Sequence, residues 1–133
     1  MAAIKAKGNK DTELKLISIF RAYKISGWRR NQKLIGKPDF VFRRERLVVF
    51  VDGCFWHGCP IHCRKPGSNV DYWLSKIARN QRRDLFVGKD LRQKGWRVLR
   101  VWEHSLDTPS RVARRIKSVL SAAHNGAKMR QQR

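Results

Sequence analysis

The hydrophobic positions along the chain follow two spacings, one typical of helices and one typical of strands. Asp11–Thr12 can cap a helix, and apolar residues then recur at helical spacing as far as Ser26–Gly27. Two short apolar runs, at residues 38–42 and 47–51, flank a segment of charged residues. This arrangement predicts a hairpin of two buried strands with its turn at residues 43–46.

The second half of the chain predicts a helix, a strand and another helix. Asp71 can cap a long basic helix that closes at Gly95, and residues 96–102 read as a further apolar strand. A final helix over residues 109–123 begins with proline in its first turn, and Asn125–Gly126 would stop it. This order of elements predicts an α/β fold in which a small mixed β-sheet is flanked by helices.

The chain is expected to form one domain. Its 133 residues contain no internal repeat and no Gly/Ser-rich linker, which predicts a single domain over residues 11–123. Residues 1–10 are expected to be a short basic N-terminal arm and residues 124–133 a frayed basic tail. No segment approaches the roughly 20 apolar residues of a membrane span, and the first ten residues carry no signal segment. The expected location is therefore cytoplasmic and nucleoid-associated.

Basic residues strongly outnumber acidic ones. Lys and Arg total 31 against 10 Asp and Glu, a formal net charge of +21. This charge favours a polyanionic partner such as nucleic acid, and a solvated basic surface like that of a ribosomal protein is the alternative interpretation. The hydrophobic content of 41% and the five Trp residues indicate a folded domain rather than a disordered basic protein.

A segment rich in Cys and His follows the predicted hairpin and contains every cysteine of the chain. Structural zinc takes four ligands at tetrahedral corners, usually Cys and His. Cys54, Cys59 and His62 supply three of them, and the fourth is either Cys63 or His104. The alternative is that the three cysteines are buried and unrelated.

Two acidic residues mark the ends of the predicted hairpin strands. Asp39 follows Pro38 at the start of the first strand, and Asp52 closes the second. Both carboxylates can therefore reach one spot near the sheet edge, an arrangement similar to the PD-(D/E)xK nuclease core, which holds divalent cations. Cys54 stands where that core has its lysine. We expect His57 to act on the attacking water instead, unless it is a spare zinc ligand or a structural loop residue.

Two longer motifs are more specific than any single residue. They are Gly-Cys-Phe-Trp-His-Gly-Cys-Pro at residues 53–60 and Gly-Trp-Arg-Val-Leu-Arg-Val-Trp-Glu-His at residues 95–104. On these motifs the chain resembles the very short patch repair (Vsr) DNA mismatch endonucleases. The resemblance spans roughly residues 4–106, about three-quarters of the chain, and its matching segments lie at residues 9–14, 36–40, 50–60, 72–80, 83–84 and 95–104.

The resemblance implies a restriction-endonuclease-like fold and magnesium-dependent hydrolysis of DNA. Asp39 and the backbone carbonyl of Val51 would hold the catalytic magnesium, and Glu13 would reach it through water. His57 would act on the attacking water, and Asp84 would orient that water as a partner behind the metal ligands.

The sequence departs from the family pattern in two places. The Val51-Asp52 pair is Thr-His in the best-known form of the family, so we expect Asp52 to be either an extra metal ligand or an orienting group. Residues 1–5 resemble the end of a longer arm that wraps the DNA groove. Either this member lacks the DNA contacts of that arm, or the true N-terminus of the protein lies upstream.

The resemblance also assigns the aromatic residues and the zinc ligands. Phe55 and Trp56 would form a wedge that enters the base stack beside a mismatch, and Trp73 would add a further intercalating ring. Composition alone would place Phe55 and Trp73 in the core. The implied zinc ligands are Cys54, Cys59, His62 and His104, which leaves Cys63 as a surplus thiol.

The activity that the resemblance implies is a nick on the 5′ side of the mispaired thymine in a T·G mismatch. The expected protein is a monomer acting on double-stranded DNA, and association with mismatch-repair proteins and a cytosine methyltransferase is left open. One alternative is a zinc-stabilised nucleic-acid-binding protein with a decayed active site, and another is a nuclease with a different DNA target. The presence of Asp39, His57 and Asp84 together favours the enzyme.

Overall fold

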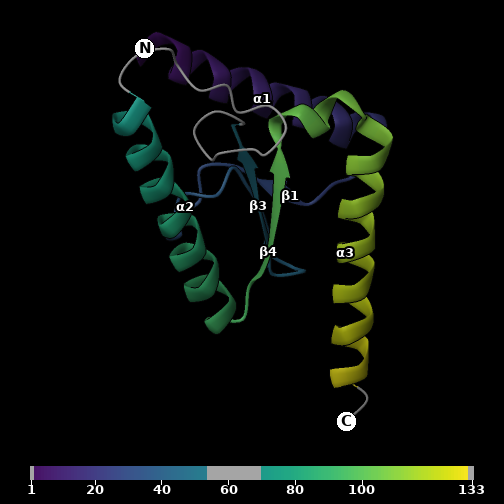
Figure 1. Ribbon diagram of the computed structural model, residues 1–133. Helices are drawn as coiled ribbons and strands as arrows, with labels where there is room; N and C mark the ends of the chain where they lie inside the picture. Colours follow the sequence, from purple (N-terminus) through teal and green to yellow (C-terminus); the bar gives the residue numbers. More distant parts are fainter. Residues whose placement is uncertain (1, 54–69, 132–133) are drawn as a thin grey trace.

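The computed structural model describes residues 2–53 and 70–131, with side chains over residues 12–53 and 71–124. Figure 1 shows the arrangement of the helices and strands. In chain order these are α1 (Ala2–Ala22), β1 (Trp28–Arg29), β2 (Phe40–Phe42), β3 (Leu47–Asp52), α2 (Val70–Gln93), β4 (Arg97–Trp102), the 3-10 helix η1 (Glu103–Asp107) and α3 (Pro109–Gln131). The predicted order of helices and strands is confirmed, and β1 is a short strand that the sequence pattern did not predict.

The four strands form one mixed sheet in the order β1-β2-β3-β4. β1 pairs antiparallel with β2, and β2 pairs antiparallel with β3 across the predicted turn at residues 43–46. β3 and β4 run parallel. Parallel neighbours need a long crossover connection, and α2 lies within it. The predicted hairpin and the small mixed sheet flanked by helices are therefore confirmed.

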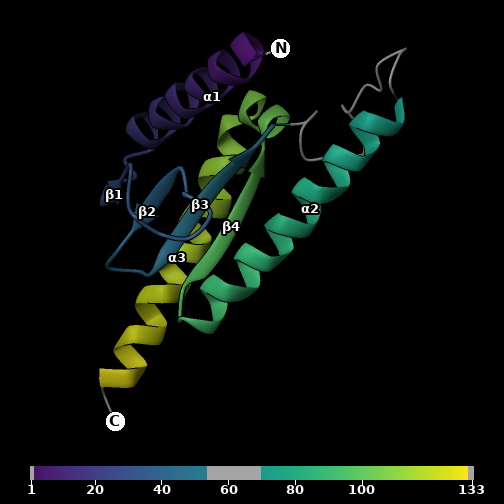
Figure 2. The ribbon, with the colours of Figure 1, turned by 90° about the vertical axis from the view of Figure 1, so that its left-hand side faces the viewer.

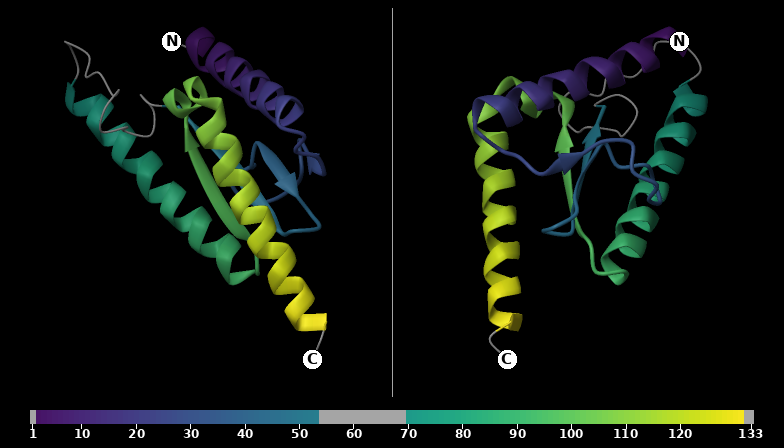
Figure 3. Two further views of the ribbon diagram at one scale, coloured as in Figure 1. Left: turned by 90° about the vertical axis from the view of Figure 1, so that its right-hand side faces the viewer. Right: turned by 180° about the vertical axis from the view of Figure 1, so that it is seen from behind.

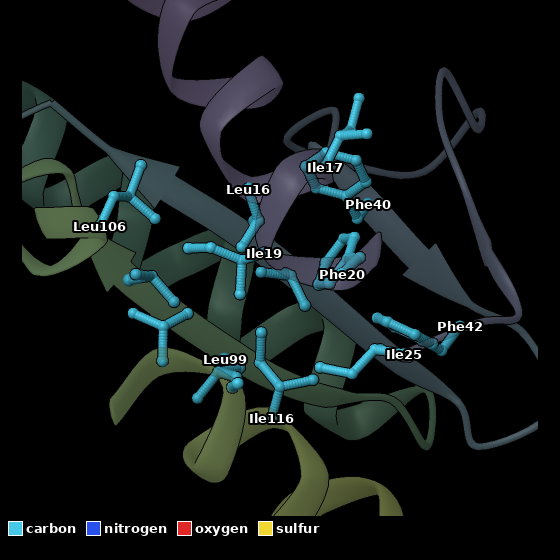
Figure 4. Close-up of a cluster of buried hydrophobic side chains, with 14 of the residues drawn as sticks. Leu16, Ile17, Ile19, Phe20, Ile25, Phe40, Phe42, Leu99, Leu106 and Ile116 are labelled. Carbon is cyan, nitrogen blue, oxygen red and sulfur yellow. The ribbon is translucent and has the colours of Figure 1, made fainter. Parts of the chain in front are cut away.

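Hydrophobic side chains cover both faces of the sheet. On one face α1 and α3 pack onto the strands through a cluster that includes Phe20, Phe40 and Ile116 (Figure 4). On the other face α2 packs through Val87 and Leu91. Figures 2 and 3 show the sheet between these two layers of helices.

The strand alternation decides which side chains face α2. Successive residues of a strand point to opposite faces, and Phe50 of β3 belongs to the cluster on the α2 side. Asp52 lies two residues further on, and Arg100 of β4 is paired in register with Phe50. Asp52 and Arg100 therefore face α2, where they can meet side chains of that helix.

Both terminal helices extend toward the chain ends beyond their predicted limits, whereas α1 ends at Ala22, before its predicted end at Ser26–Gly27. α1 begins at Ala2 rather than at Asp11, so the residues expected to form a separate arm are helical. α3 continues to Gln131, past the predicted stop at Asn125–Gly126. Ala and Lys at these ends are strong helix formers, and a single glycine costs only about 1 kcal/mol, so the local cap and stop signals are overridden. Within the described ranges no helix is long and apolar enough to cross a membrane.

Candidate active site

A cavity of about 660 Å³ lies between α2 and the end of the sheet at which β3 finishes. Its charged and polar lining includes Asp39, Asp52 and Arg100 from the sheet and Lys76, Asn80, Arg83 and Asp84 from α2. The structure thus brings together Asp39, Asp52 and Asp84, three of the predicted catalytic acids. Asp84 comes close to the two sheet residues because α2 folds back over the sheet. The spacing of residues in the sequence does not predict this arrangement.

Asp39 is held at the junction of β2 and β3. Its amide donates a hydrogen bond to the carbonyl of Val49 at 3.0 Å, and its Oδ2 accepts one from the amide of Val51 at 2.7 Å. The side chain would lose this second bond if it swung toward solvent. The carboxylate is therefore kept at the cavity by the backbone of the neighbouring strand.

The electrostatic surroundings of Asp39 disfavour its charged form. Burial raises the pKa of this carboxyl from 3.8 to about 6, and the charges of Glu13 and Asp52 act in the same direction. The hydrogen bond from the Val51 amide opposes the rise without cancelling it. The site therefore carries repulsion between carboxylates that a proton or a cation can relieve.

Glu13 lies on α1 and approaches Asp39 from that helix. The charge of Glu13 contributes to the raised pKa of Asp39, and Glu13 forms an ion pair with Arg30, which directly follows β1. Two neighbouring carboxylates repel each other when both are charged. A cation bound beside Asp39 and Glu13 would relieve this repulsion.

Arg100 is a charged residue of the cavity that the sequence analysis did not single out. Its Nη1 lies 2.9 Å from Oδ1 of Asp52 and 3.6 Å from Oδ1 of Asp84. Its Nη2 donates a 3.4 Å hydrogen bond to the backbone carbonyl of Asp84. One guanidinium group therefore links an acid on β3 to an acid on α2.

A sequence signal for Arg100 did exist. It interrupts the apolar run Val98–Trp102 at the middle of a strand. An arginine at such a position must find a partner when the strand is buried. In a chain of net charge +21 one more basic residue carried little weight, and so this signal was missed.

Two further predicted residues lie in the described part of the chain. Trp73, near the start of α2, packs edge-on against Tyr72 with ring centroids 5.2 Å apart and has Lys76 over its ring at 5.9 Å. His104, in η1, stacks on Trp102 with centroids 6.5 Å apart. Both side chains are half-buried, so neither belongs to the central core.

Several predictions fall outside the described residues. They concern Cys54, Phe55, Trp56, His57, Cys59, His62 and Cys63. Among the residues that are described, no group of three or more His, Cys, Asp or Glu side chains is placed to hold a metal ion. The zinc ligands, the aromatic wedge and the role of His57 therefore stay predictions.

The sequence matches the model of the family described as DNA mismatch endonuclease Vsr over residues 1–65. It is 40% identical over 108 residues to the type II nicking enzyme V.NmeDIP of Neisseria meningitidis serogroup C, a match that covers 80% of this chain and 72% of that protein. The chain belongs to the Vsr family. The resemblance inferred from the sequence motifs is thereby confirmed.

Other Vsr-family relatives match to different extents. The DNA mismatch endonuclease Vsr of Escherichia coli K12 is 37% identical over 77% of this chain and 68% of its own length. The type II nicking enzyme V.NaeI of Lentzea aerocolonigenes is 56% identical over 51% of this chain, and the match spans only 41% of that relative. A match over 80% of the chain must include its middle part, and with it the cavity residues from Asp39 to Asp84.

Proposed function

We propose that this Vsr-family protein is a magnesium-dependent DNA endonuclease that nicks one strand on the 5′ side of the mispaired thymine in a T·G mismatch. The observation that carries the proposal is the carboxylate of Asp39, held by the Val51 amide in a cavity that Asp52 and Asp84 also line. Family membership supplies the substrate class, because its relatives are named as DNA mismatch endonucleases and nicking enzymes.

The donor atoms around Asp39 fit magnesium. This ion prefers hard oxygen ligands, is held by one or two carboxylates, and keeps several waters. Asp39 and the carbonyl of Val51 would hold it directly and Glu13 through water, and the raised pKa of Asp39 supports a site that gains from a cation. When bound, magnesium would supply positive charge for the attacking water and the leaving oxygen.

The remaining acids would orient the reacting groups. Asp52 is paired with Arg100 at 2.9 Å, which favours an orienting role for it over that of an extra metal ligand. Asp84 lies at the wall formed by α2 and would orient the attacking water. His57 would take the proton from that water at an imidazole nitrogen, a role supported by its family motif and by the usual pKa of histidine.

Contacts with DNA would come from α2 and from the aromatic residues. Trp73, Lys76 and Asn80 recur at helical spacing, so they share one face of α2, and the last two line the cavity. An aromatic ring beside basic groups suits a stacked base next to a phosphate. Trp73 would therefore intercalate from α2, and Phe55 and Trp56, which precede it in the sequence, would form the wedge.

The sheet register supports His104 as the fourth zinc ligand. Asp52 and Trp102 are parallel partners at the ends of β3 and β4. Cys54 follows the first by two residues and His104 follows the second by two residues. Both ligands would therefore leave the sheet at the same edge, where Cys59 and His62 would complete a structural zinc site.

A nicking assay tests the proposal. Supercoiled and linear duplexes that carry one T·G pair in varied sequence contexts would be incubated with and without magnesium, and matched duplexes would serve as the control. We expect one nick, 5′ to the thymine, in the magnesium reaction. Magnesium-dependent cutting of matched duplexes at other sites would instead support the nuclease with a different DNA target, an alternative that the relatives named type II nicking enzymes also suit. Binding without any cutting would support the decayed site.

A further inference from the structure

The guanidinium group of Arg100 occupies a place where three structural elements meet. It rises from β4, lies over the Phe50 ring of β3 at 4.2 Å from the ring centroid, and contacts Asp84 of α2 through both of its terminal nitrogens. It also holds Asp52 at the end of β3. Arg100 thus spans the two walls of the cavity, the sheet and the helix.

The network is only partly exposed to solvent. The side chains of Arg100, Asp52 and Asp84 are 25%, 9% and 19% exposed. Salt screens such partly buried charge pairs much less than exposed ones. Removing one partner of a buried pair destabilises the fold, because the other charge stays buried without compensation. A planar guanidinium is suited to this position because it offers several donors in a fixed fork and also stacks on an aromatic ring.

The network also lies where α2 changes from apolar to polar contacts with the sheet. Toward its C-terminal end α2 packs through Val87 and Leu91. Asp84 lies nearly one turn before Val87, at the level of the cavity. Within the described residues, α2 therefore contacts the sheet through this apolar cluster and, nearer the proposed catalytic centre, through the contacts of Asp84 with Arg100.

We infer that Arg100 is a positioning residue of this centre. Through its shared contacts with Asp52 and Asp84 it sets the distance between the carboxylate of α2 and the carboxylate of Asp39 on the sheet. This inference rests on the proposed nuclease function and adds to it a residue outside the predicted set. Arg100 makes no contact with the reacting atoms in this scheme; it acts through Asp84.

Four variants separate positioning from simple stabilisation. Arg100→Met removes the charge and keeps the length of the side chain, and Arg100→Lys keeps the charge without the fork. Asp52→Asn/Arg100→Met removes both members of the closest ion pair. Arg97→Met is the matched control, because Arg97 lies on the same strand with its side chain exposed and away from the cavity. For each, the single-turnover nicking rate on a T·G duplex, the Kd for that duplex and the Tm would be measured.

We expect Arg100→Met to lower the single-turnover rate by about 10–100-fold, as is usual for partners that orient catalytic groups, with a change in Kd of less than about 3-fold. Arg100→Lys should recover part of the rate. The double variant should regain Tm, because no buried Asp52 charge is left without its arginine, yet its rate should stay low because Asp84 still lacks the contacts that Arg100 makes with it. Recovery of rate together with Tm, or a wild-type rate in Arg100→Met, would overturn the inference.

A second measurement keeps this test distinct from that of the proposed function. If wild-type protein binds but does not nick any duplex, the proposed function fails and the positioning role of Arg100 fails with it. If wild type nicks and Arg100→Met nicks equally well, only the inference fails. Independently of activity, Arg100→Met and Asp84→Asn should shift Tm non-additively, since residues in contact are coupled. Additive shifts would overturn the link between β4 and α2.

Discussion

The amide of Val51 donates a 2.7 Å hydrogen bond to Oδ2 of Asp39 and so joins the end of β3 to the start of β2. This bond favours the charged carboxylate, whereas burial and the neighbouring acids favour the protonated one, and the pKa rises to about 6. A carboxylate that is fixed in place, in surroundings that disfavour its negative charge, is well suited to bind a cation. It is also a source of instability when no cation is bound, and both properties can be measured.

The variant Asp39→Asn should lose nicking while gaining stability. Asn keeps the shape and can still accept the Val51 hydrogen bond, but it cannot supply a charged ligand. Because folding raises the pKa of Asp39 from 3.8 to about 6, the charged form weakens the metal-free fold above about pH 6. We expect a gain of roughly 1–3 kcal/mol in unfolding free energy at about pH 8 without added magnesium, measured by urea denaturation.

The stability gained by Asp39→Asn should depend on pH. The gain should shrink as the pH falls from about 6 toward 4, because wild-type Asp39 becomes protonated in both the folded and the unfolded state. Asp107→Asn is the control, since Asp107 is exposed and its contact with Lys15 is 4.0 Å long. Retained nicking by Asp39→Asn would remove Asp39 from the active site.

The pH at which the nicking rate falls on the acidic side should depend on magnesium concentration. Protons and magnesium compete for Asp39, whose pKa is raised to about 6 in the metal-free protein. At low magnesium the rate should halve near that pH, and higher magnesium should shift the midpoint downward. Single-turnover rates between about pH 5 and 8 at several magnesium concentrations would measure it. A midpoint independent of magnesium would point to another group, such as His57.

Replacing Gly36 should damage both the fold and the cavity. Gly36 has φ +78°, and a Cβ there would lie 2.5 Å from Cγ1 of Val87, which lines the cavity on α2. Gly27 has φ +89° with nothing near its added Cβ, so Gly27→Ala carries the backbone strain alone. We expect Gly36→Ala to cost roughly 1–3 kcal/mol more than Gly27→Ala in urea denaturation, from overpacking.

A compensating change tests the cause of that loss. Val87→Ala combined with Gly36→Ala removes the methyl groups that the new Cβ would meet. The double variant should recover part of the difference between the two glycine substitutions, together with part of the nicking rate. Equal losses for Gly36→Ala and Gly27→Ala would show that α2 can move aside without cost.

Metal analysis should find about one zinc per chain, and a strong chelator should unfold the protein, because ligands for structural zinc come together only in the folded state. His104→Ala should lower the zinc content. His124→Ala should leave it unchanged, because His124 lies on α3 and pairs with Glu45 at 2.9 Å. A protein that is folded and free of zinc would contradict the proposed ligand set.

The sequence by itself determined three of the four strands, the three α-helices and the proximity of two acidic residues of the site. Buried strands and amphipathic helices differ in the spacing of apolar residues over a few positions, so the hairpin and α2 were predictable within a few residues. Asp39 and Asp52 were predictable as neighbours because a short hairpin brings its two ends together. The same local reasoning failed at both chain ends, where helix formers on either side outweighed a single cap or stop signal.

Only the tertiary structure decided how the charges of the site meet. The contacts of Glu13 with Asp39, and of Arg100 with Asp52 and Asp84, join elements that are far apart along the chain. The parallel pairing of β3 with β4 and the return of α2 over the sheet create the contacts of Arg100. The packing of α1 on the other face of the sheet brings Glu13 to Asp39. Charges interact according to distance and burial, and neither quantity is contained in the spacing of residues along a sequence.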